Sequence, residues 1–301
     1  MKKLYGVTAA MVTPFGEDGR VDRAALALLT EALIQKGVNC LYPCGTTGEM
    51  VHLSEKERKE IAETVIGTAS GRARVFVHCG AMRQEETVEL LRHAHRAGAD
   101  GAGAVTPMFL GVTGEEMEAY YKTLSAAVPE DFPIYLYNIP QCAANDISPK
   151  TAARLARGCP NITGIKYSFP DFLRTLEYLE IPDFSVLHGC DKMFAELLLM
   201  GCDGTVSGVA GVFPEPFVKV YGAWERRDLT DMQKWQKICV RFCDLLRCGT
   251  NMSWFKQALE LRGIPAGTMR EPQRDLFVEE TAETMSGLKR LCEEVGIELR
   301  M

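Results

Sequence analysis

The sequence predicts an α/β fold, a (β/α)8 TIM barrel with a C-terminal helical extension. Short apolar runs with strand character alternate with longer segments of helical periodicity along most of the chain. Eight such pairs occupy roughly 225 residues at a regular repeat of about 25 to 30 residues, as in a closed barrel. A doubly wound open sheet is the competing α/β fold, and the count of eight pairs favours the barrel.

The first half of this pattern begins with an apolar run, residues 6–12, which a Thr-Pro pair ends. Asp22 is a typical N-cap for the helix that follows, and Gly37 stops that helix. Ser54, with Glu57 three residues later, forms a capping box that opens the second helix. We therefore expect strands at 6–12, 40–43, 74–78 and 101–105, and helices at 22–36, 54–69, 87–97 and 115–127.

The second half continues the alternation in the same order. Ser148 followed by Pro149 places a proline in the first turn of a helix, where its missing N–H is tolerated. We expect strands at 133–137, 162–166, 184–187 and 204–207, with helices starting at 148 and spanning 171–179, 192–200 and 216–225.

The pattern changes from Leu229 onward, where strand signals cease. Three helical stretches are expected, at 230–247, 252–262 and 280–295, and no linker rich in Pro, Gly or Ser precedes them. We therefore divide the chain into a barrel, residues 1–226, and a C-terminal helical region, residues 227–301, packed on the barrel.

Composition excludes several classes of function. The contents of 47% hydrophobic and 25% charged residues are ordinary for a soluble globular protein. A net charge of −6 argues against binding to nucleic acid or to a membrane surface. The N-terminus lacks the apolar core of a signal peptide and no run approaches ~18 apolar residues, so a cytoplasmic location without a membrane span is expected. The eleven cysteines form no C-x-x-C pair, and we expect reduced, mostly buried thiols.

Two neighbouring strands end in reactive side chains. Lys166 ends the strand at 162–166 and Tyr137 ends the preceding strand, so their heads should meet at the mouth of the barrel. A lysine that loses its proton can attack a carbonyl and form a Schiff base, and a phenol beside it can shuttle the protons involved. The alternatives are a salt bridge from Lys166 to Asp171 or Glu49 and a core role for Tyr137.

A second feature lies just past the second strand, in the turn Gly45-Thr46-Thr47-Gly48. Its glycines permit a tight turn that aims backbone N–H groups and two hydroxyls at one point. That arrangement suits a small carboxylate or phosphate, and an ordinary turn is the alternative.

Small and polar residues also follow the last two strands. Gly189 and Asp191 come after the seventh strand, Val206 and Ser207 end the eighth, and we predict that these four residues bind substrate. The segment after the eighth strand is either a barrel phosphate site or space for substrate next to Lys166. No histidine has a second ligand at metal spacing, so no metal site is expected.

With these residues in place, the chain resembles the dihydrodipicolinate synthase / N-acetylneuraminate lyase family of Schiff-base aldolases. The resemblance spans essentially the whole chain, with the motifs in the family's order and spacing. They are Gly45–Glu49, Val105–Pro107, Leu136–Pro140, Gly164–Lys166 and Gly201–Gly204.

The resemblance implies a role for each matching residue. Lys166 would condense with pyruvate or another 2-oxo acid, and Tyr137 would relay protons to and from the reacting oxygen. Thr46 and Thr47, with the backbone N–H groups of the turn at Gly45, would hold the substrate carboxylate. The protonated imine would serve as the electron sink, so no metal or organic cofactor is implied. The family also implies a homo-oligomer, a tetramer or a dimer.

Two departures separate the chain from true dihydrodipicolinate synthases. Cys142 stands where those enzymes carry an arginine that pairs with the carboxylate of aspartate semialdehyde, and a thiol cannot make a bidentate pair. Phe109 offers no hydroxyl where the family donates a tyrosine across a subunit interface.

Sialic acid lyases match the chain imperfectly as well. Asp191 could accept hydrogen bonds from sugar hydroxyls, as in those enzymes. Lys192 replaces their glutamate, Gly208 replaces a serine, and Tyr167 replaces a small hydroxyl residue next to the lysine. We treat Phe109, Cys142, Tyr167 and Lys192 as candidates for setting specificity.

The sequence therefore predicts a pyruvate-dependent class I aldolase or lyase whose partner is an aldehyde, acting on a 2-keto-3-deoxy sugar acid or a sialic-acid-like substrate. One alternative is a dihydrodipicolinate synthase that condenses pyruvate with aspartate semialdehyde. The other is a non-catalytic paralogue that only binds 2-oxo acids.

Overall fold

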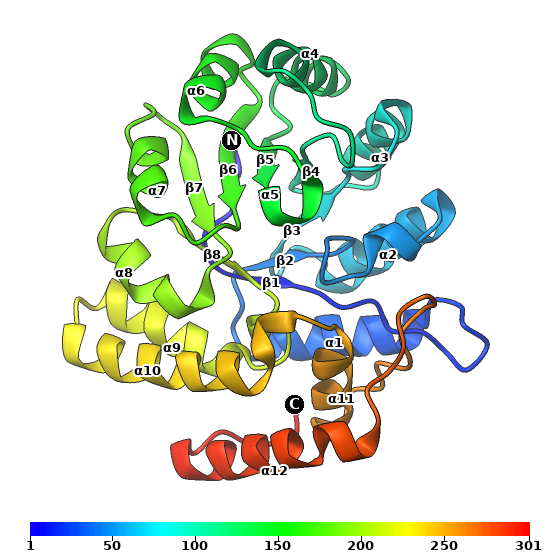
Figure 1. The fold of residues 1–301 in the computed structure, drawn as a ribbon, viewed down its shortest axis with the longest axis vertical. Helices are drawn as coiled ribbons and strands as arrows, with labels where there is room; N and C mark the ends of the chain where they lie inside the picture. The colour runs from blue at the N-terminus through cyan, green and yellow to red at the C-terminus, as the bar shows by residue number, and fades with distance from the viewer.

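The computed structural model describes residues 1–301 and confirms the predicted barrel with its helical extension. Eight parallel strands follow one another in chain order around the barrel, and the helices lie outside it (Figure 1). Strand β8 pairs with β1 and closes the sheet. The strands are β1 (Gly6–Ala10), β2 (Cys40–Tyr42), β3 (Arg74–His78), β4 (Gly101–Val105), β5 (Ile134–Asn138), β6 (Ile162–Tyr167), β7 (Ser185–His188) and β8 (Gly204–Ser207).

Two glycines allow the barrel to close between β8 and β1. Gly204 lies in register with Gly6, and a Cβ atom on Gly204 would be 2.1 Å from the carbonyl oxygen of Gly6. Gly6 also has a φ of +60°, which residues with side chains rarely adopt. The two backbones therefore approach at a distance that only glycine permits.

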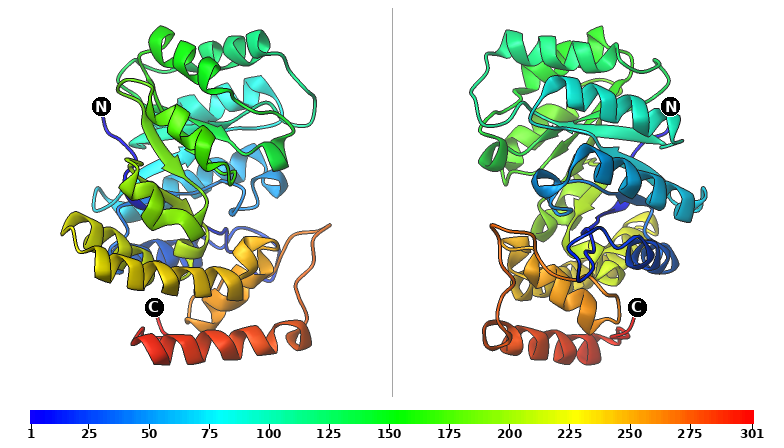
Figure 2. Two further views of the ribbon diagram at one scale, coloured as in Figure 1. Left: turned by 60° about the vertical axis from the view of Figure 1, so that its left-hand side comes forward. Right: turned by 90° about the vertical axis from the view of Figure 1, so that its right-hand side faces the viewer.

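Apolar residues form two separate layers. The larger one contains 72 buried residues and lies between the strands and the surrounding helices, which Figure 2 shows wrapped around the sheet. The smaller one contains eight buried residues, and all of them except Leu4 come from the inward-facing positions of the strands. The helices around the barrel are α1 (Arg23–Gln35), α2 (Glu55–Ala69), α3 (Gln84–Arg96), α4 (Gly114–Ser125), α5 (Pro140–Ala143), α6 (Pro149–Gly158), α7 (Phe172–Leu179), α8 (Phe194–Leu199) and α9 (Pro214–Glu225).

The capping residues act as the sequence predicts. The Asp22 side chain accepts a hydrogen bond from the backbone N–H of Ala25, and Ser54 forms a full capping box with Glu57. The errors lie where no such signal exists. Helix α3 begins three residues earlier than predicted because Arg83 makes no side-chain cap that would mark its start. The single turn α5 was not predicted, and the helix predicted at 192–200 is divided into the 3-10 turn η2 (Asp191–Met193) and α8.

The three C-terminal helices occur as predicted, with shifted ends. Helix α10 (Leu229–Leu245) runs along α9, while α11 (Ser253–Leu261) and α12 (Val278–Val295) lie beyond it at one side of the barrel (Figure 1). None of the helices combines the length and the hydrophobicity that a bilayer-spanning segment requires.

A buried arginine joins this helical region to the barrel. Arg262, which is 0% exposed, pairs with Glu215 of α9 at 2.5 Å and donates to the carbonyl oxygen of Val212 at 2.6 Å. Its guanidinium also stacks on Phe213, 4.5 Å from the ring centroid. One side chain thus satisfies groups at the C-terminal end of the barrel and in the last segment of the chain.

Replacing Arg262 should therefore destabilise the whole fold. Arg262→Met leaves the Glu215 carboxylate with only the Lys36 amine, 3.6 Å away, and removes the donor to the Val212 carbonyl oxygen, so we expect the free energy of unfolding in urea to fall by about 3 kcal/mol. Arg241→Met is the matched control, because Arg241 pairs with Glu294 on the exposed surface. Equal shifts of the urea midpoint in the two variants would contradict a special role for the buried pair.

Candidate active site

The centre of the candidate site is the Lys166 amine. Inward and outward positions alternate along β6, so Lys166 points into the barrel while Ile165 and Tyr167 face the helices. Lys166 is only 4% exposed. Its Nζ lies over two aromatic rings, 3.9 Å from the centroid of Tyr137 and 4.7 Å from that of Tyr42. The rings therefore fix the amine by cation–π contacts.

Neither carboxylate considered as a partner from sequence reaches this amine. Glu49 is paired with Lys256 at 2.7 Å, and both side chains are 1% exposed. Asp171 caps α7, where it accepts a hydrogen bond of 3.0 Å from the backbone N–H of Arg174. Lys166 forms no ion pair within 4.0 Å, so its amine is not committed to a carboxylate.

Tyr137 and Thr46 stand beside the amine. Tyr137 pairs in register with Lys166 across β5 and β6. Its hydroxyl shares a hydrogen bond of 3.2 Å with the Oγ1 of Thr46, which belongs to the predicted turn after β2. The structure therefore brings together a lysine, a phenol and a hydroxyl turn that lie far apart in the sequence.

The buried imidazole of His78, which lies beside Tyr137, was not identified from the sequence. The His78 ring packs edge-on against Tyr137 at 5.6 Å, and its Nδ1 lies 2.9 Å from the carbonyl oxygen of Cys44. Burial, with the charges of Arg58 and Lys166, lowers the pKa of His78 well below its usual value, so the imidazole is neutral. No local motif distinguishes His78 or Arg58 from surface residues, so sequence alone offered no signal.

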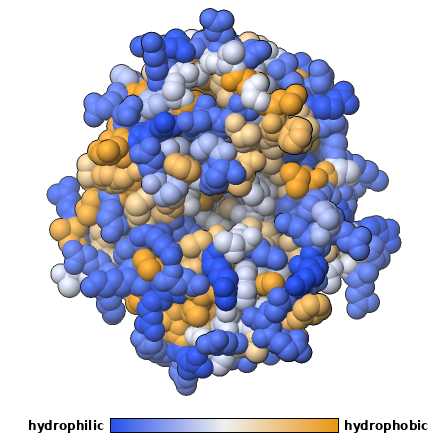
Figure 3. Space-filling view, viewed as in Figure 1, coloured by the Kyte–Doolittle hydropathy of each residue, from blue (hydrophilic) through white to orange (hydrophobic).

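These groups open into a cavity of about 640 Å3 at the carboxyl ends of the strands. The predicted residues that line it are Thr46, Thr47, Tyr137, Cys142, Lys166, Gly189, Asp191, Lys192 and Val206. Polar and apolar residues are interspersed over the face of the molecule drawn in Figure 3. A further wall, not predicted, comes from the segment after α10 and includes Cys248, Gly249, Thr250, Met252 and Phe255.

Asp191 supplies an acidic group to the cavity wall. Its carboxylate accepts hydrogen bonds from Ser207 at 2.7 Å and from Thr205 at 3.3 Å. Burial raises the pKa of Asp191 to about 7 despite these bonds, so both protonation states are populated near neutral pH. Ser207, a predicted substrate-binding residue, does not line the cavity, and its hydroxyl donates to the Asp191 carboxylate that does.

Three other predicted residues lie outside the cavity. Tyr167 faces the helix layer, packed against Tyr178 at 5.2 Å and His188 at 5.4 Å, because the strand alternation turns it away from Lys166. Phe109 is 82% exposed. Gly45 accepts backbone hydrogen bonds that close the turn and is not part of the lining. The structure therefore corrects the proposed specificity role of Tyr167.

Lys192 and Cys142 are the remaining predicted specificity residues that line the cavity. Lys192 is on the cavity rim, where its amine pairs with Asp244 of α10. All eleven cysteines are free thiols, and eight are buried. Cys142 lines the cavity as an exposed thiol, so a neutral group stands on that wall.

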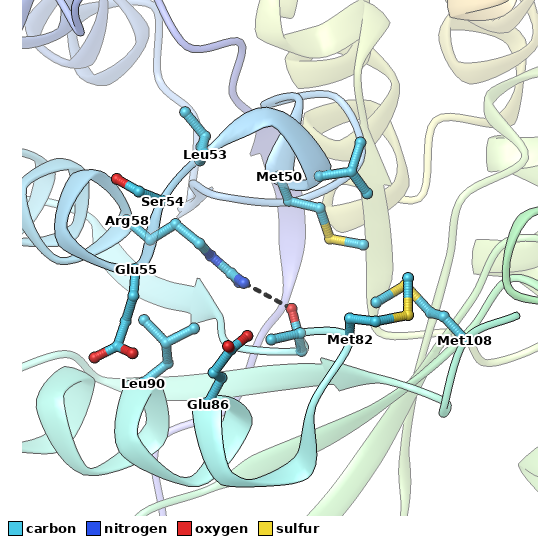
Figure 4. Close-up of a pocket in the computed structure, with 12 residues that line it drawn as sticks. Met50, Leu53, Ser54, Glu55, Arg58, Met82, Glu86, Leu90 and Met108 are labelled. Carbon is cyan, nitrogen blue, oxygen red and sulfur yellow. Dashed lines mark hydrogen bonds between the residues drawn. The ribbon is translucent and has the colours of Figure 1, made fainter.

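A smaller cavity of about 290 Å3 lies near the first, on the side of η1 (Met50–His52). Met50, Met82 and Met108 point into it together with Arg58, whose guanidinium donates to the carbonyl oxygen of Gly80 at 2.8 Å (Figure 4). Arg58 is thereby held by backbone groups and is not directed at Lys166.

The comparisons with known proteins agree with this geometry. Residues 3–291 match the Dihydrodipicolinate synthetase family, so the chain belongs to that family and is a lyase. It is 34% identical to a 4-hydroxy-tetrahydrodipicolinate synthase of Syntrophus aciditrophicus, over 97% of this chain and 98% of the other. It is 30% identical to a probable 2-dehydro-3-deoxy-D-pentonate aldolase, YjhH, of Escherichia coli, with coverages of 89% and 90%.

A solved structure supports the same assignment. The chain superimposes with a TM-score of 0.92 on a catalytic lysine mutant of the Ruminococcus gnavus sialic acid aldolase. The two sequences are 25% identical, and the match covers 98% of this chain and 99% of the other. Synthases and aldolases are thus both similar to this chain, and the coarse class is a lyase or aldolase of the family.

The shifted pKa of Asp191 predicts a pH-dependent stability. Its folded-state pKa of about 7 exceeds the ordinary 3.8, so folding favours the protonated form. The stabilisation is fully present below about pH 4 and is lost as pH rises through about 7. Asp191→Asn should therefore gain in unfolding free energy relative to wild type as pH rises from about 4 to about 8. Urea unfolding at several pH values measures this difference, and a flat difference would contradict it.

Proposed function

We propose that this protein is a pyruvate-dependent class I aldolase that forms or cleaves a C–C bond of a 2-oxo acid through an imine at Lys166. The observation that carries this proposal is the environment of the Lys166 amine. It lies at the base of a large cavity, between two aromatic rings, without a carboxylate partner. An amine in this setting is available to a carbonyl carbon.

The reaction follows from the groups around the amine. The Lys166 nitrogen attacks the C2 carbonyl of the 2-oxo acid, and the carbinolamine loses water to give a protonated imine. Tyr137, hydrogen-bonded to Thr46, is placed to donate the proton to the departing oxygen. When the C3–C4 bond breaks, its electron pair enters the imine to form an enamine, and the hydroxyl on C4 becomes an aldehyde by giving its proton to the Tyr137 phenolate left by the dehydration step. Protonation of the enamine and hydrolysis then release pyruvate.

The substrate carboxylate would be held by the turn after β2. Thr46 and Thr47 both line the cavity, and the turn presents them next to Tyr137. No arginine lines this cavity, so hydroxyl and backbone N–H donors replace a guanidinium. The protonated imine would supply the electron sink, and the proposed mechanism needs no metal or organic cofactor.

Two side chains that line the cavity favour a polyhydroxylated substrate. Asp191 accepts or donates hydrogen bonds at neutral pH, as sugar hydroxyls require, and Cys142 offers no charge to a second carboxylate. The serine that sialic acid lyases carry would not fit at position 208. A Cβ atom on Gly208 would lie 2.7 Å from the ring of Phe255. We therefore favour a 2-keto-3-deoxy sugar acid, and the name of the E. coli relative supports this class.

A dihydrodipicolinate synthase is the second candidate. The name of the Syntrophus aciditrophicus relative, at 34% identity, favours it. Two assays separate the candidates: consumption of pyruvate with aspartate semialdehyde, and release of pyruvate from a panel of 2-keto-3-deoxy acids.

Borohydride trapping tests the imine directly. Reduction in the presence of pyruvate should attach the pyruvate carbon skeleton covalently to Lys166, as peptide mass mapping would show. Lys166→Met should abolish the adduct, whereas Lys192→Met should retain it, because Lys192 is paired at the rim. An adduct on another lysine, or none in the wild type, would disprove the proposal.

Removing the Tyr137 hydroxyl should slow the chemical step. Tyr137→Phe keeps the ring over Lys166 but loses the proton relay, so we expect kcat for pyruvate release to fall about 10²- to 10⁴-fold with a smaller change in KM. Tyr42→Phe is the matched control, since the Tyr42 hydroxyl has no hydrogen-bond partner. Equal losses in the two variants would show that the effect is one of packing.

A further inference from the structure

Three thiols gather at one wall of the cavity, on the side of the C-terminal region. Cys190 and Cys248 line the cavity, and Cys243 lies behind Cys248 in the last turns of α10. Cys248 is exposed, Cys243 is buried, and the Cys248 sulfur lies 3.6 Å from the carbonyl oxygen of Cys243.

The backbone that holds Cys248 in this position is strained. Arg247, Cys248 and Gly249 have φ values of 50°, 49° and 70°, so two consecutive residues with side chains adopt the left-handed conformation. Such residues are uncommon and persist where the surrounding contacts impose them. The turn follows α10 directly and returns Cys248 toward Cys243.

The charges around Cys248 favour its thiolate. The neighbouring Cys243 thiol is the largest influence and, with the Lys192 amine, lowers the pKa of Cys248 to about 6, although burial and the charge of Asp244 oppose this. Burial, with the charge of Asp191, raises the pKa of Cys190 to about 12. Cys248 is therefore the reactive member of the group, and Cys190 is inert.

We propose that Cys248 and Cys243 are an oxidisable thiol pair, which a peroxide converts into a disulfide at the rim of the active-site cavity. The Cys248 thiolate attacks one peroxide oxygen, the O–O bond breaks, and hydroxide leaves, which gives a sulfenic acid. The Cys243 sulfur then attacks the Cys248 sulfur, the S–O bond breaks and water leaves. In total, two thiols lose two electrons and two protons, and the peroxide is reduced to two molecules of water.

The disulfide would act on the cavity through the turn that carries Cys248. Cys248, Gly249 and Met252 line the cavity, and a Cβ atom on Gly249 would lie 2.7 Å from the ring of Phe255. Phe255 in turn lies against Gly208 beside Thr47. A cross-link that pulls on the turn therefore moves a wall next to the carboxylate-binding residues. This effect on turnover rests on the proposed function, whereas the cross-link itself does not.

Peptide mapping tests the cross-link without any assay of activity. Trypsin cleaves after Arg241 and Arg247, so Cys243 and Cys248 fall on separate peptides, Phe242–Arg247 and Cys248–Lys256. After treatment of the full chain with hydrogen peroxide and alkylation of free thiols, we expect these peptides to be joined until dithiothreitol is added. Cys142→Ser is the matched control, because Cys142 is also an exposed cavity thiol but is not part of the proposed pair, and it should retain the link.

The remaining outcomes each decide one part of the proposal. In wild type, peroxide should lower the rate of pyruvate release at least about fivefold, and dithiothreitol should restore it. In Cys243→Ser, peroxide should cause no loss in the rate of pyruvate release that dithiothreitol restores. The rate of each variant is compared only with the rate of its own reduced form. Absence of the linked peptides in wild type would overturn the thiol pair. Linked peptides with an unchanged rate would overturn the effect on the cavity, and linked peptides in a protein without aldolase activity would reject only the proposed function.

Discussion

The site depends on keeping the Lys166 amine buried and free of carboxylates. Moving an ammonium out of water costs several kcal/mol, and proteins usually offset this with an ion pair. Here the rings of Tyr42 and Tyr137 take that place, and each desolvated cation–π contact contributes about 2 kcal/mol. A ring stabilises the charge without forming an ion pair, which leaves the amine uncommitted for the proposed reaction.

Glu49 is the carboxylate most able to compete for the Lys166 amine, and a second lysine pairs with it instead. Glu49 follows the Thr-Thr turn directly and would be within reach of the barrel mouth, but Lys256 of α11 holds it in a fully buried pair. Lys256 also donates to the carbonyl oxygen of Thr268 at 2.7 Å. The C-terminal region therefore does more than cover the barrel: it anchors the turn that presents Thr46 and keeps its acidic residue away from Lys166.

Sequence predicted the parts of this arrangement that local signals encode. Strand alternation and capping residues such as Asp22 and Ser54 located the barrel, and the strand ends located Lys166 and Tyr137. It failed where a role depends on long-range packing. In the sequence, nothing distinguishes His78 from other strand residues, and only the fold brings Arg58 and Tyr137 next to it. Cys248 lines the cavity only because the turn after α10 folds back. Tyr167 was misassigned because adjacency to Lys166 in sequence means the opposite face in a strand.

These failures share a physical cause that bears on specificity. The strand ends, which place the reacting groups, are fixed by the barrel register, since Tyr137 and Lys166 must lie side by side once β5 and β6 pair. The distal wall is built from the turn after α10 and from η2, neither of which any register constrains. Chemistry and substrate choice are thus encoded by different parts of the chain. Under the proposed function, the barrel can keep its Lys166 chemistry while changes in the C-terminal region alter which substrate fits the distal wall.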